Sequence, residues 1–420
     1  MRPRPLPKDD DGLVHSSQLV GHSHPFRWFM LAALCIVYCS FGVMLSAIPP
    51  MITEVRADLE ISRSEIGLAL GAWPLIYIVT APPAGRIIDR IGVSRAIRTG
   101  LALIVVSGVV QASAQGATSL WIAIAIVGIG GPLISASAPK LVADWFQDPA
   151  ERRLAVGMYT SAPALGGVLA LALTNSVLQP LLGDWRRVLL FETAVCFVAL
   201  IVWVIVNNTA PLPPVEESGD VALGNDGSVR SLLHSRGVRL ALVLGAGSYF
   251  VNQALVNWLP NVLEEGNGLS ARAASSIAAV SLALGILARL SIPGLAQPGR
   301  RTMVLNSVMA VMALSLVAMT FGGTVIVVIA ALILGVRSAL NSLVIVVLME
   351  ADGVTRSNMG AANGLWFSIA GIGGAAGTFA VGLLSDSDAG FDGALMVLAA
   401  IMSVMIIVTA AHGRRPRVRI

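Results

Sequence analysis

The sequence predicts an all-α membrane protein in which twelve transmembrane helices form two pseudo-symmetric halves of six helices each. Composition is the first observation, because 55% of the 420 residues are hydrophobic, only 12% are charged and the mean hydropathy is +0.79. That is more apolar sequence than one soluble core can bury, whereas apolar runs of about 20 residues match the thickness of a bilayer. The other two observations are an internal repeat and the distribution of positive charge.

Twelve continuous apolar runs supply the spans, and each ends where charged or turn-forming residues begin. Continuous runs favour helices over the short alternating strands of a membrane β-barrel. The expected spans fall near residues 28–52, 66–84, 96–114, 119–143, 154–178, 187–207, 238–262, 273–296, 303–321, 324–349, 360–384 and 392–411.

A repeated segment divides the chain into two halves. Ser161, Gly166 and Gly167 in the fifth run recur as Ser368, Gly373 and Gly374 in the eleventh run, at one common offset. The repeat predicts an N-terminal half at 27–207 and a C-terminal half at 237–411, joined by a polar linker at 208–236. The repeated glycines fit close helix packing and also fit helices that move past one another, and the sequence leaves both interpretations open.

Positive charge predicts the orientation. With both termini in the cytoplasm, 21 of the 28 lysines and arginines lie inside and five lie outside, as the positive-inside rule requires. We therefore expect a multi-pass protein of the cell (inner) membrane, with a disordered cytoplasmic tail at 1–26 and a basic cytoplasmic tail at 412–420. Arginines spread over many loops are topology signals, so no nucleic-acid partner is expected.

The sequence offers no candidate metal site, cofactor site or catalytic cluster, so it does not predict an enzyme. Cys35, Cys39 and Cys196 lie within spans and are expected to pack as small apolar residues. The five histidines lie in the tails or the linker, which leaves no histidine relay in the membrane.

Two arginines inside apolar runs are the best indicators of a binding site. The remaining two of the 28 basic residues are Arg289 in the eighth run and Arg337 in the tenth, and a charge in hydrocarbon requires a partner, a wet cavity or an anionic ligand. Arg337 is about 18 Å into a core of about 30 Å. Arg289 is near the cytoplasmic face, where it binds substrate, pairs or extends to the membrane surface.

Other polar side chains within the runs are expected to shape the cavity. They are Tyr38, Tyr77, Tyr249, Asn252, Asn341 and Trp366. Glu192 is the only acid well inside a span, and we expect it to pair or pack there.

The loop after the second run carries the most specific motif. It reads Gly85-Arg86-Ile-Ile-Asp89-Arg90-Ile-Gly92-Val-Ser-Arg95. Its glycines permit a tight turn, and Asp89 can bind arginines or cap a helix N-terminus. This loop resembles the G-x-x-x-D-R-x-G-x-x-R signature of the major facilitator superfamily. A degraded copy without the aspartate follows the eighth run at 294–301, and the segment from Asp144 to Gly157 resembles the lead into helix five of many facilitators.

The resemblance implies a substrate site between the halves and transport by alternating access. Ala288-Arg289 is similar to the helix-eight arginine that binds the substrate anion in monocarboxylate and oxalate/formate-type facilitators, and Asn257-Trp258-Leu259-Pro260 is similar to cyanate-permease-like members. We expect secondary active transport of a small anion that is monocarboxylate-, cyanate- or nitrate-like, with protons as the coupling ion. The expected partners are that small-molecule substrate and the lipid bilayer, and the expected state is a monomer.

The same resemblance implies a cytoplasmic gate and leaves two other functions open. The gate would be formed by Gly85, Arg86, Asp89, Arg90, Gly92, Arg95 and Asp144. The first alternative is efflux of amphipathic drugs, which the low aromatic content and the absence of an acid in helix one disfavour. The second is a non-transporting receptor or scaffold, which the absence of an added soluble domain disfavours.

Overall fold

A computed structural model of the chain describes residues 25–211, 232–297, 299–355 and 358–413. Twelve helical segments in the described residues are long and apolar enough to cross a membrane, so the predicted all-α membrane fold is confirmed. The predicted tails at 1–26 and 412–420 and the linker at 208–236 lie largely outside the described residues.

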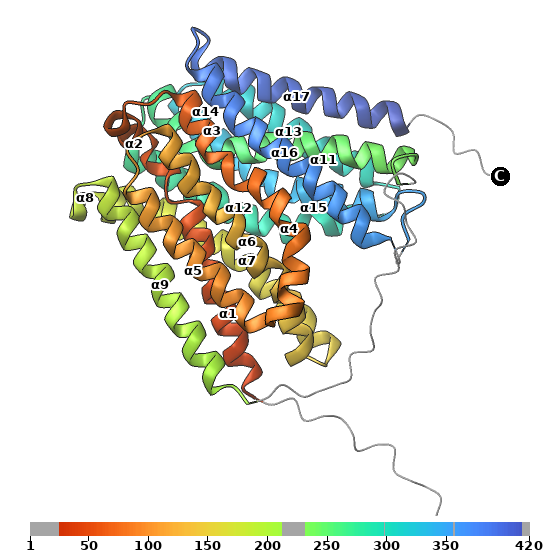
Figure 1. Cartoon of the computed structure of the whole chain (residues 1–420). Helices are drawn as coiled ribbons and strands as arrows, with labels where there is room; N and C mark the ends of the chain where they lie inside the picture. Colours follow the sequence, from red (N-terminus) through yellow and green to blue (C-terminus); the bar gives the residue numbers. More distant parts are fainter. Residues whose placement is uncertain (1–24, 212–231, 298, 356–357, 414–420) are drawn as a thin grey trace, which may run out of the picture.

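The N-terminal half contains the first six spans, in the red to yellow-green part of Figure 1. The first span is interrupted after α1, where Pro49 and Pro50 begin a short 3₁₀ turn. The fifth contains a π-helical turn, η2. The elements of this half are α1 (Arg27–Leu45), η1 (Pro49–Met51), α2 (Ile52–Leu59), α3 (Arg63–Leu70), α4 (Ala72–Ile91), α5 (Val93–Ala112), α6 (Ala117–Trp145), α7 (Pro149–Leu173), η2 (Thr174–Leu178), α8 (Gln179–Leu182) and α9 (Trp185–Thr209).

The C-terminal half contains the other six spans. The tenth span tightens to a 3₁₀ turn immediately before Arg337, and the seventh ends in a second π-helical turn. The elements are α11 (Arg236–Asn261), η3 (Val262–Gly266), α12 (Ala271–Leu295), α13 (Arg301–Phe321), α14 (Thr324–Ile333), η4 (Leu334–Val336), α15 (Arg337–Met349), α16 (Met359–Ser385) and α17 (Gly390–Gly413).

Polar capping residues explain where several helices begin. The side chains of Asp148, Asp184, Ser235 and Ser270 each accept a hydrogen bond from a backbone N–H in the first turn of the helix that follows. Ser62 forms a reciprocal capping box with Glu65 at the start of α3. These bonds satisfy N–H groups that the helix itself leaves unpaired.

Each half is a bundle with its own internal packing. In the first half α5 packs on α6 and α1 on α7, and in the second half α11 packs on α16 and α13 on α17. The repeated glycines Gly166 and Gly373 belong to this packing, because a Cβ at either would come under 3.0 Å from a backbone carbonyl oxygen of α1 or α11. Close packing within each half therefore accounts for this pair.

The two halves meet mainly through α3 against α16 and α7 against α12. Hydrogen bonds and ion pairs between the halves gather at one end of the bundle, which we call the clasped end and which contains η1, α2, η2 and η3. At the other end, the open end, lie the α4–α5 turn and the first turns of α7 and α16. A Cβ added further along these helices, at Gly157 of α7 or Gly364 of α16, would meet no atom within 4 Å.

Candidate functional site

The four tyrosines of the chain form a row that crosses from one half to the other. Tyr38 of α1 packs edge-on against Tyr159 of α7, with ring centroids 5.2 Å apart. Tyr38 is within electrostatic range of Tyr77 of α4, and Tyr77 is within range of Tyr249 of α11. The Tyr77 hydroxyl is 2.6 Å from Ser135 Oγ. Tyr159 was not among the residues predicted from the sequence, although it lies within the repeated glycine segment.

Arg289 lines a cavity between α7 and α12. Its side chain is exposed, and the cavity wall includes Ser161 of the N-terminal half and Ser338 of α15. Arg289 is also within electrostatic range of Tyr249. The structure therefore brings together a guanidinium and two hydroxyls, and the wall of this cavity contains no acidic side chain.

Arg337 is buried in the C-terminal half, with 2% of its surface exposed. Its Nη1 donates hydrogen bonds to Ser281 Oγ at 3.2 Å and to Leu334 O at 3.1 Å, whereas its Nε has no partner. Among the described residues no carboxylate forms an ion pair with it. Its neighbour Ser338 lines the cavity and Arg337 does not.

The remaining predicted cavity residues differ in their exposure. Asn252 is half-buried, and its Nδ2 donates to Gln253 Oε1 at 3.4 Å. Asn341 is half-buried, and its Oδ1 has no partner. Trp366 is fully buried, donates to Ala241 O at 3.2 Å and packs against Tyr249 with centroids 5.5 Å apart. Trp366 therefore does not line the cavity that contains Arg289.

The predicted gate residues lie at the open end. Gly92 ends α4 with a φ of 86°, a conformation that favours glycine. Asp89 forms an ion pair with Lys140 at the end of α6, and both side chains are exposed. In this conformation the partner of Asp89 is thus a lysine of its own half. Arg86, Arg90, Arg95 and Asp144 are also exposed.

The second half contains an ion pair near the degraded copy of the motif. Arg301, at the start of α13 and in this copy, pairs with Glu350 at the end of α15. The loss of the aspartate from the copy was visible in the sequence, but the pairing of Arg301 with Glu350 was not.

The clasped end contains a polar network that our sequence analysis missed. Glu265 of η3 accepts hydrogen bonds from Arg63 and from Thr53 at 2.9 Å, and it pairs with Arg56 at 3.6 Å. Asp386 accepts from the backbone N–H groups of Arg63 at 3.1 Å and Ser64 at 2.7 Å. The available signal was the set of acids and arginines directly beside the ends of the runs.

Hydrogen bonding affects the ionisation of Asp386. Burial by itself raises the pKa of this carboxyl, but the bonds from Ser64 and from the Arg63 N–H outweigh it, and the pKa is lowered from its ordinary value. Asp386 therefore accepts these bonds as a carboxylate at neutral pH.

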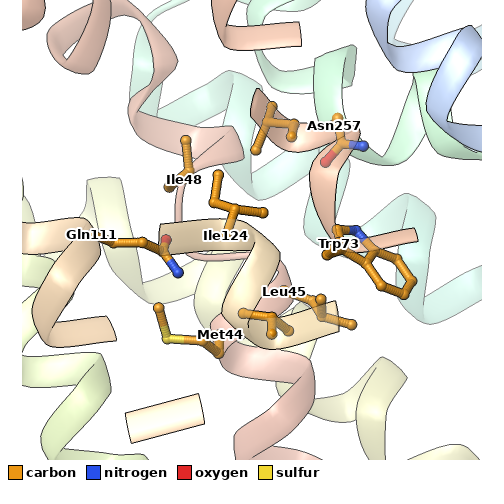
Figure 2. A pocket seen from close by; sticks show the side chains of 9 residues that line it. Met44, Leu45, Ile48, Trp73, Gln111, Ile124 and Asn257 are labelled. Atoms are coloured by element: carbon orange, nitrogen blue, oxygen red, sulfur yellow. The ribbon is translucent and has the colours of Figure 1, made fainter. Parts of the chain in front are cut away.

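The interior near the clasped end is almost filled. A cavity here has a volume of about 20 Å³, which is room for about one water molecule. It is lined by Met44, Leu45, Ile48, Leu70, Trp73, Gln111, Ile124, Val127 and Asn257. Figure 2 shows side chains that line it. The cavity that contains Arg289 is equally small.

No metal site is evident in the part of the chain that the structure describes. No group of three or more histidine, cysteine, aspartate or glutamate side chains there is arranged to hold an ion. The chemistry available in the cavity is hydrogen bonding and positive charge.

Twelve membrane-length helical segments in the described residues, arranged as two bundles with a small cavity between them that contains Arg289, define a polytopic membrane protein of the transporter type. The sequence model described as Major Facilitator Superfamily matches residues 33–353. The chain belongs to this superfamily. The relatives that it matches are transporters and not enzymes.

Relatives and solved structures agree with that assignment. The uncharacterized transporter YycB of Bacillus subtilis (strain 168) is 24% identical over 172 residues, which cover 40% of this chain and 42% of that protein. The hexuronate transporter of the same organism is 22% identical over 399 residues, covering 89% of this chain and 90% of that protein. The match to YycB thus spans under half of that relative's length.

One solved structure shows the same fold. The crystal structure of a bacterial homologue of the human lysosomal transporter Spinster, described as inward-facing and unoccupied, superposes with a TM-score of 0.74 at 17% sequence identity. The match covers 93% of this chain and 96% of that chain.

Proposed function

We propose that this protein is a secondary active transporter of the cell (inner) membrane that moves a small anion by alternating access. The observation that carries the proposal is the position of Arg289, whose exposed guanidinium lines the cavity between the halves beside Ser161 and Ser338. A guanidinium can hold a carboxylate through charge-assisted hydrogen bonds. The buried Arg337 adds positive charge behind this wall, with no carboxylate paired to it among the described residues.

The orientation follows from positive charge at the open end. Arg86, Arg90, Arg95 and Lys140 all lie there, and loops rich in arginine and lysine remain in the cytoplasm. We therefore assign the open end to the cytoplasm and the clasped end to the outside. In this assignment the structure is a conformation whose cavity is accessible from the cytoplasm.

The substrate class we propose is small carboxylates, which includes sugar acids as well as monocarboxylates. The name of the full-length relative, a hexuronate transporter, supports this extension, because a hexuronate carries one carboxylate and several hydroxyls. The amides of Asn252 and Asn341, both half-buried, are side chains that hydrogen-bond hydroxyls as donors and as acceptors. Cyanate and nitrate stay in the test panel as smaller anions.

Uptake by the purified protein in liposomes tests the proposal. We expect saturable uptake of at least one labelled anion among glucuronate, galacturonate, lactate, cyanate and nitrate. Arg289→Ala should raise its KM about 10- to 150-fold, since a hydrogen bond to a charged group contributes about 1.5–3 kcal/mol.

Arg272→Ala is the matched control, because Arg272 is an exposed arginine in the first turn of the same helix, at the clasped end. It should leave the KM unchanged. Unaltered anion uptake by Arg289→Ala would contradict the proposal. Saturable uptake of a cationic amphipath, indifferent to Arg289, would instead support the drug-efflux alternative.

A further inference from the structure

Glu192 is a buried carboxyl that the anion site does not use. It lies on α9 with 2% of its surface exposed. Its Oε1 accepts a hydrogen bond from Thr174 Oγ1 at 3.1 Å, and its Oε2 has no partner. A carboxylate has two oxygens that each require solvation, so this environment satisfies only part of the charged form.

No cation is close enough to pair with Glu192 among the described residues. The helices that pack on α9 are α1, α5 and α8. The charged side chains of these helices lie near the helix ends, as do those of α7 and, apart from Glu192, of α9. Arg186 of α9 forms an ion pair with Asp58 at 2.8 Å. Neither α8 nor η2, which supplies Thr174, has a charged or titratable side chain. The other elements have Arg27, Cys35, Tyr38 and Cys39 on α1, Arg95 and Arg98 on α5, Glu151, Arg152, Arg153 and Tyr159 on α7, and Arg186, Arg187 and Cys196 besides Glu192 on α9.

The nearest of these groups are thiols. Cys196, one turn further along α9, is within electrostatic range of Glu192 and of Cys39, and its Sγ donates to Ser40 O at 3.4 Å. The buried Arg337 could have formed a structural ion pair with Glu192. It lies in the other half, however, and donates to Ser281 instead. The expectation that Glu192 pairs with a cation therefore has no support in this conformation, and the ligand that suits the site is a proton.

Thr174 connects this carboxyl to the contact between the halves. It begins the π-helical turn η2, a distortion that is frequent at functional sites. The next residue, Asn175, donates to Pro50 O at 2.8 Å in its own half, and to Ser275 Oγ at 2.8 Å and Ala271 O at 3.3 Å in the other half. One wide turn thus holds both the Glu192 hydrogen bond and a cross-half contact of the clasped end.

We propose that Glu192 is a proton-binding site that controls the clasped end through the turn at Thr174 and Asn175. The neutral acid fits the buried position seen with the clasp closed. When the halves separate at Asn175, water reaches Thr174 and the carboxyl, and the ionised form is then solvated. This proposal rests on the proposed transport function only in naming the proton as the coupling ion.

The direction of the pH effect follows from linkage. Closing the clasp around the neutral acid takes up one proton per molecule, and opening it releases that proton to water. Because the closed clasp binds the proton better, a lower pH shifts the equilibrium towards the closed clasp. Glu192→Gln resembles the neutral acid in shape and cannot ionise, so its clasp equilibrium should stay at the low-pH position at every pH.

Distances between spin labels measure this equilibrium without any substrate. Gln115 and Asp388 are exposed loop positions at the clasped end, one in each half. Their cysteine variants can be labelled after Cys35 and Cys39 are replaced by alanine, while the buried Cys196 stays. We expect the short-distance population of the wild type to grow as the pH is lowered and that of Glu192→Gln to be constant.

Two further measurements separate a proton site from a packing role. Infrared difference spectra between high and low pH should contain the carbonyl stretch of a protonated carboxyl, and this band should be absent in Glu192→Gln. Thr174→Val should move the midpoint of the pH dependence to higher pH, because it removes the one hydrogen bond donated to the carboxylate. Glu60→Gln, an exposed acid on the same half, is the control and should change neither result.

The outcomes distinguish this proposal from the proposed function. In liposomes Glu192→Gln should lose proton-driven accumulation of the anion and retain anion exchange. A pH dependence in Glu192→Gln equal to that of the wild type, or an unchanged carboxyl band, would overturn the proton site and leave anion transport standing. If Glu192→Gln does not fold, an unshifted pH midpoint in Thr174→Val would overturn it instead. Failure of anion uptake in the wild type would affect only the proposed function, because the label distances require no anion.

Discussion

Gly67→Ala should shift the protein away from the clasped conformation. Gly67 is a buried residue of α3. A Cβ added there would lie 2.9 Å from Thr378 O, 3.3 Å from Phe379 Cα and 3.3 Å from Trp258 Cζ2. All three atoms belong to the C-terminal half, so the methyl group meets this obstacle only while the halves are together at the clasped end.

The size of the shift follows from two opposing effects. Alanine favours a helix over glycine by about 1 kcal/mol, but α3 is helical with the clasp closed or open, so this gain cancels in the equilibrium between the two. Overpacking against a backbone carbonyl costs about 1–3 kcal/mol in the closed state alone. The closed population should therefore fall about 5- to 150-fold relative to the open one.

The label pair at Gln115 and Asp388 again supplies the assay. Gly67→Ala should lengthen the measured distances at every pH, while the thermal stability of the folded protein is maintained. Gly364→Ala is the control, because a Cβ there meets nothing within 4 Å. If the distance distributions of Gly67→Ala and Gly364→Ala coincide, the role given to α3 as a contact surface of the clasp is wrong.

Four other outcomes follow from the same geometry. Because the pKa of Asp386 is lowered, the hydrogen bonds to its carboxylate stabilise the closed clasp fully above the ordinary aspartate pKa of about 4. This stabilisation is lost as the pH falls further. Asp386→Asn should therefore remove the change in label distances that occurs at acidic pH. Arg337→Ala should weaken anion uptake while folded protein remains, because it removes positive charge from behind the cavity wall, and Arg337→Lys should retain more of the uptake, as shown by uptake per folded molecule. Asp89→Asn should raise the reactivity of cysteines placed at the open end, and equal reactivity would contradict its gating role. Reporter enzymes fused after His412 or near Asp226 should both report a cytoplasmic location, and an outside location at either would contradict the predicted orientation.

The sequence predicted the twelve spans well because hydrocarbon thickness is a one-dimensional constraint on a helix. Ends moved by a few residues where a cap decided them: the run expected from 96 begins at Val93, directly after Gly92. The interruptions at η2 and η4 were not predictable from hydropathy, since a π-helical or 3₁₀ turn leaves the apolar content of a run unchanged.

The candidate site was predicted by residue type and only partly by position. Arg289 and Arg337 were both found because a charge inside an apolar run is expensive. Their different surroundings, an exposed cavity wall for one and a buried hydrogen bond to Ser281 for the other, were not predictable. Tyr159 was passed over because a single aromatic residue in an apolar helix gives no indication of which face is buried.

The sequence by itself determined the class of protein, because composition, run length and the Gly85–Arg95 motif are properties of the chain read in order. The tertiary structure decided which glycines act within a half and which act between the halves: Gly166 and Gly373 pack against helices of their own bundles, whereas Gly67 faces Thr378 across the clasp. It also placed Glu265, Arg63 and Asp386 in one network. These partners are separated by up to about 320 residues. They meet because two helical bundles close against each other, a relation that no local pattern in the chain encodes.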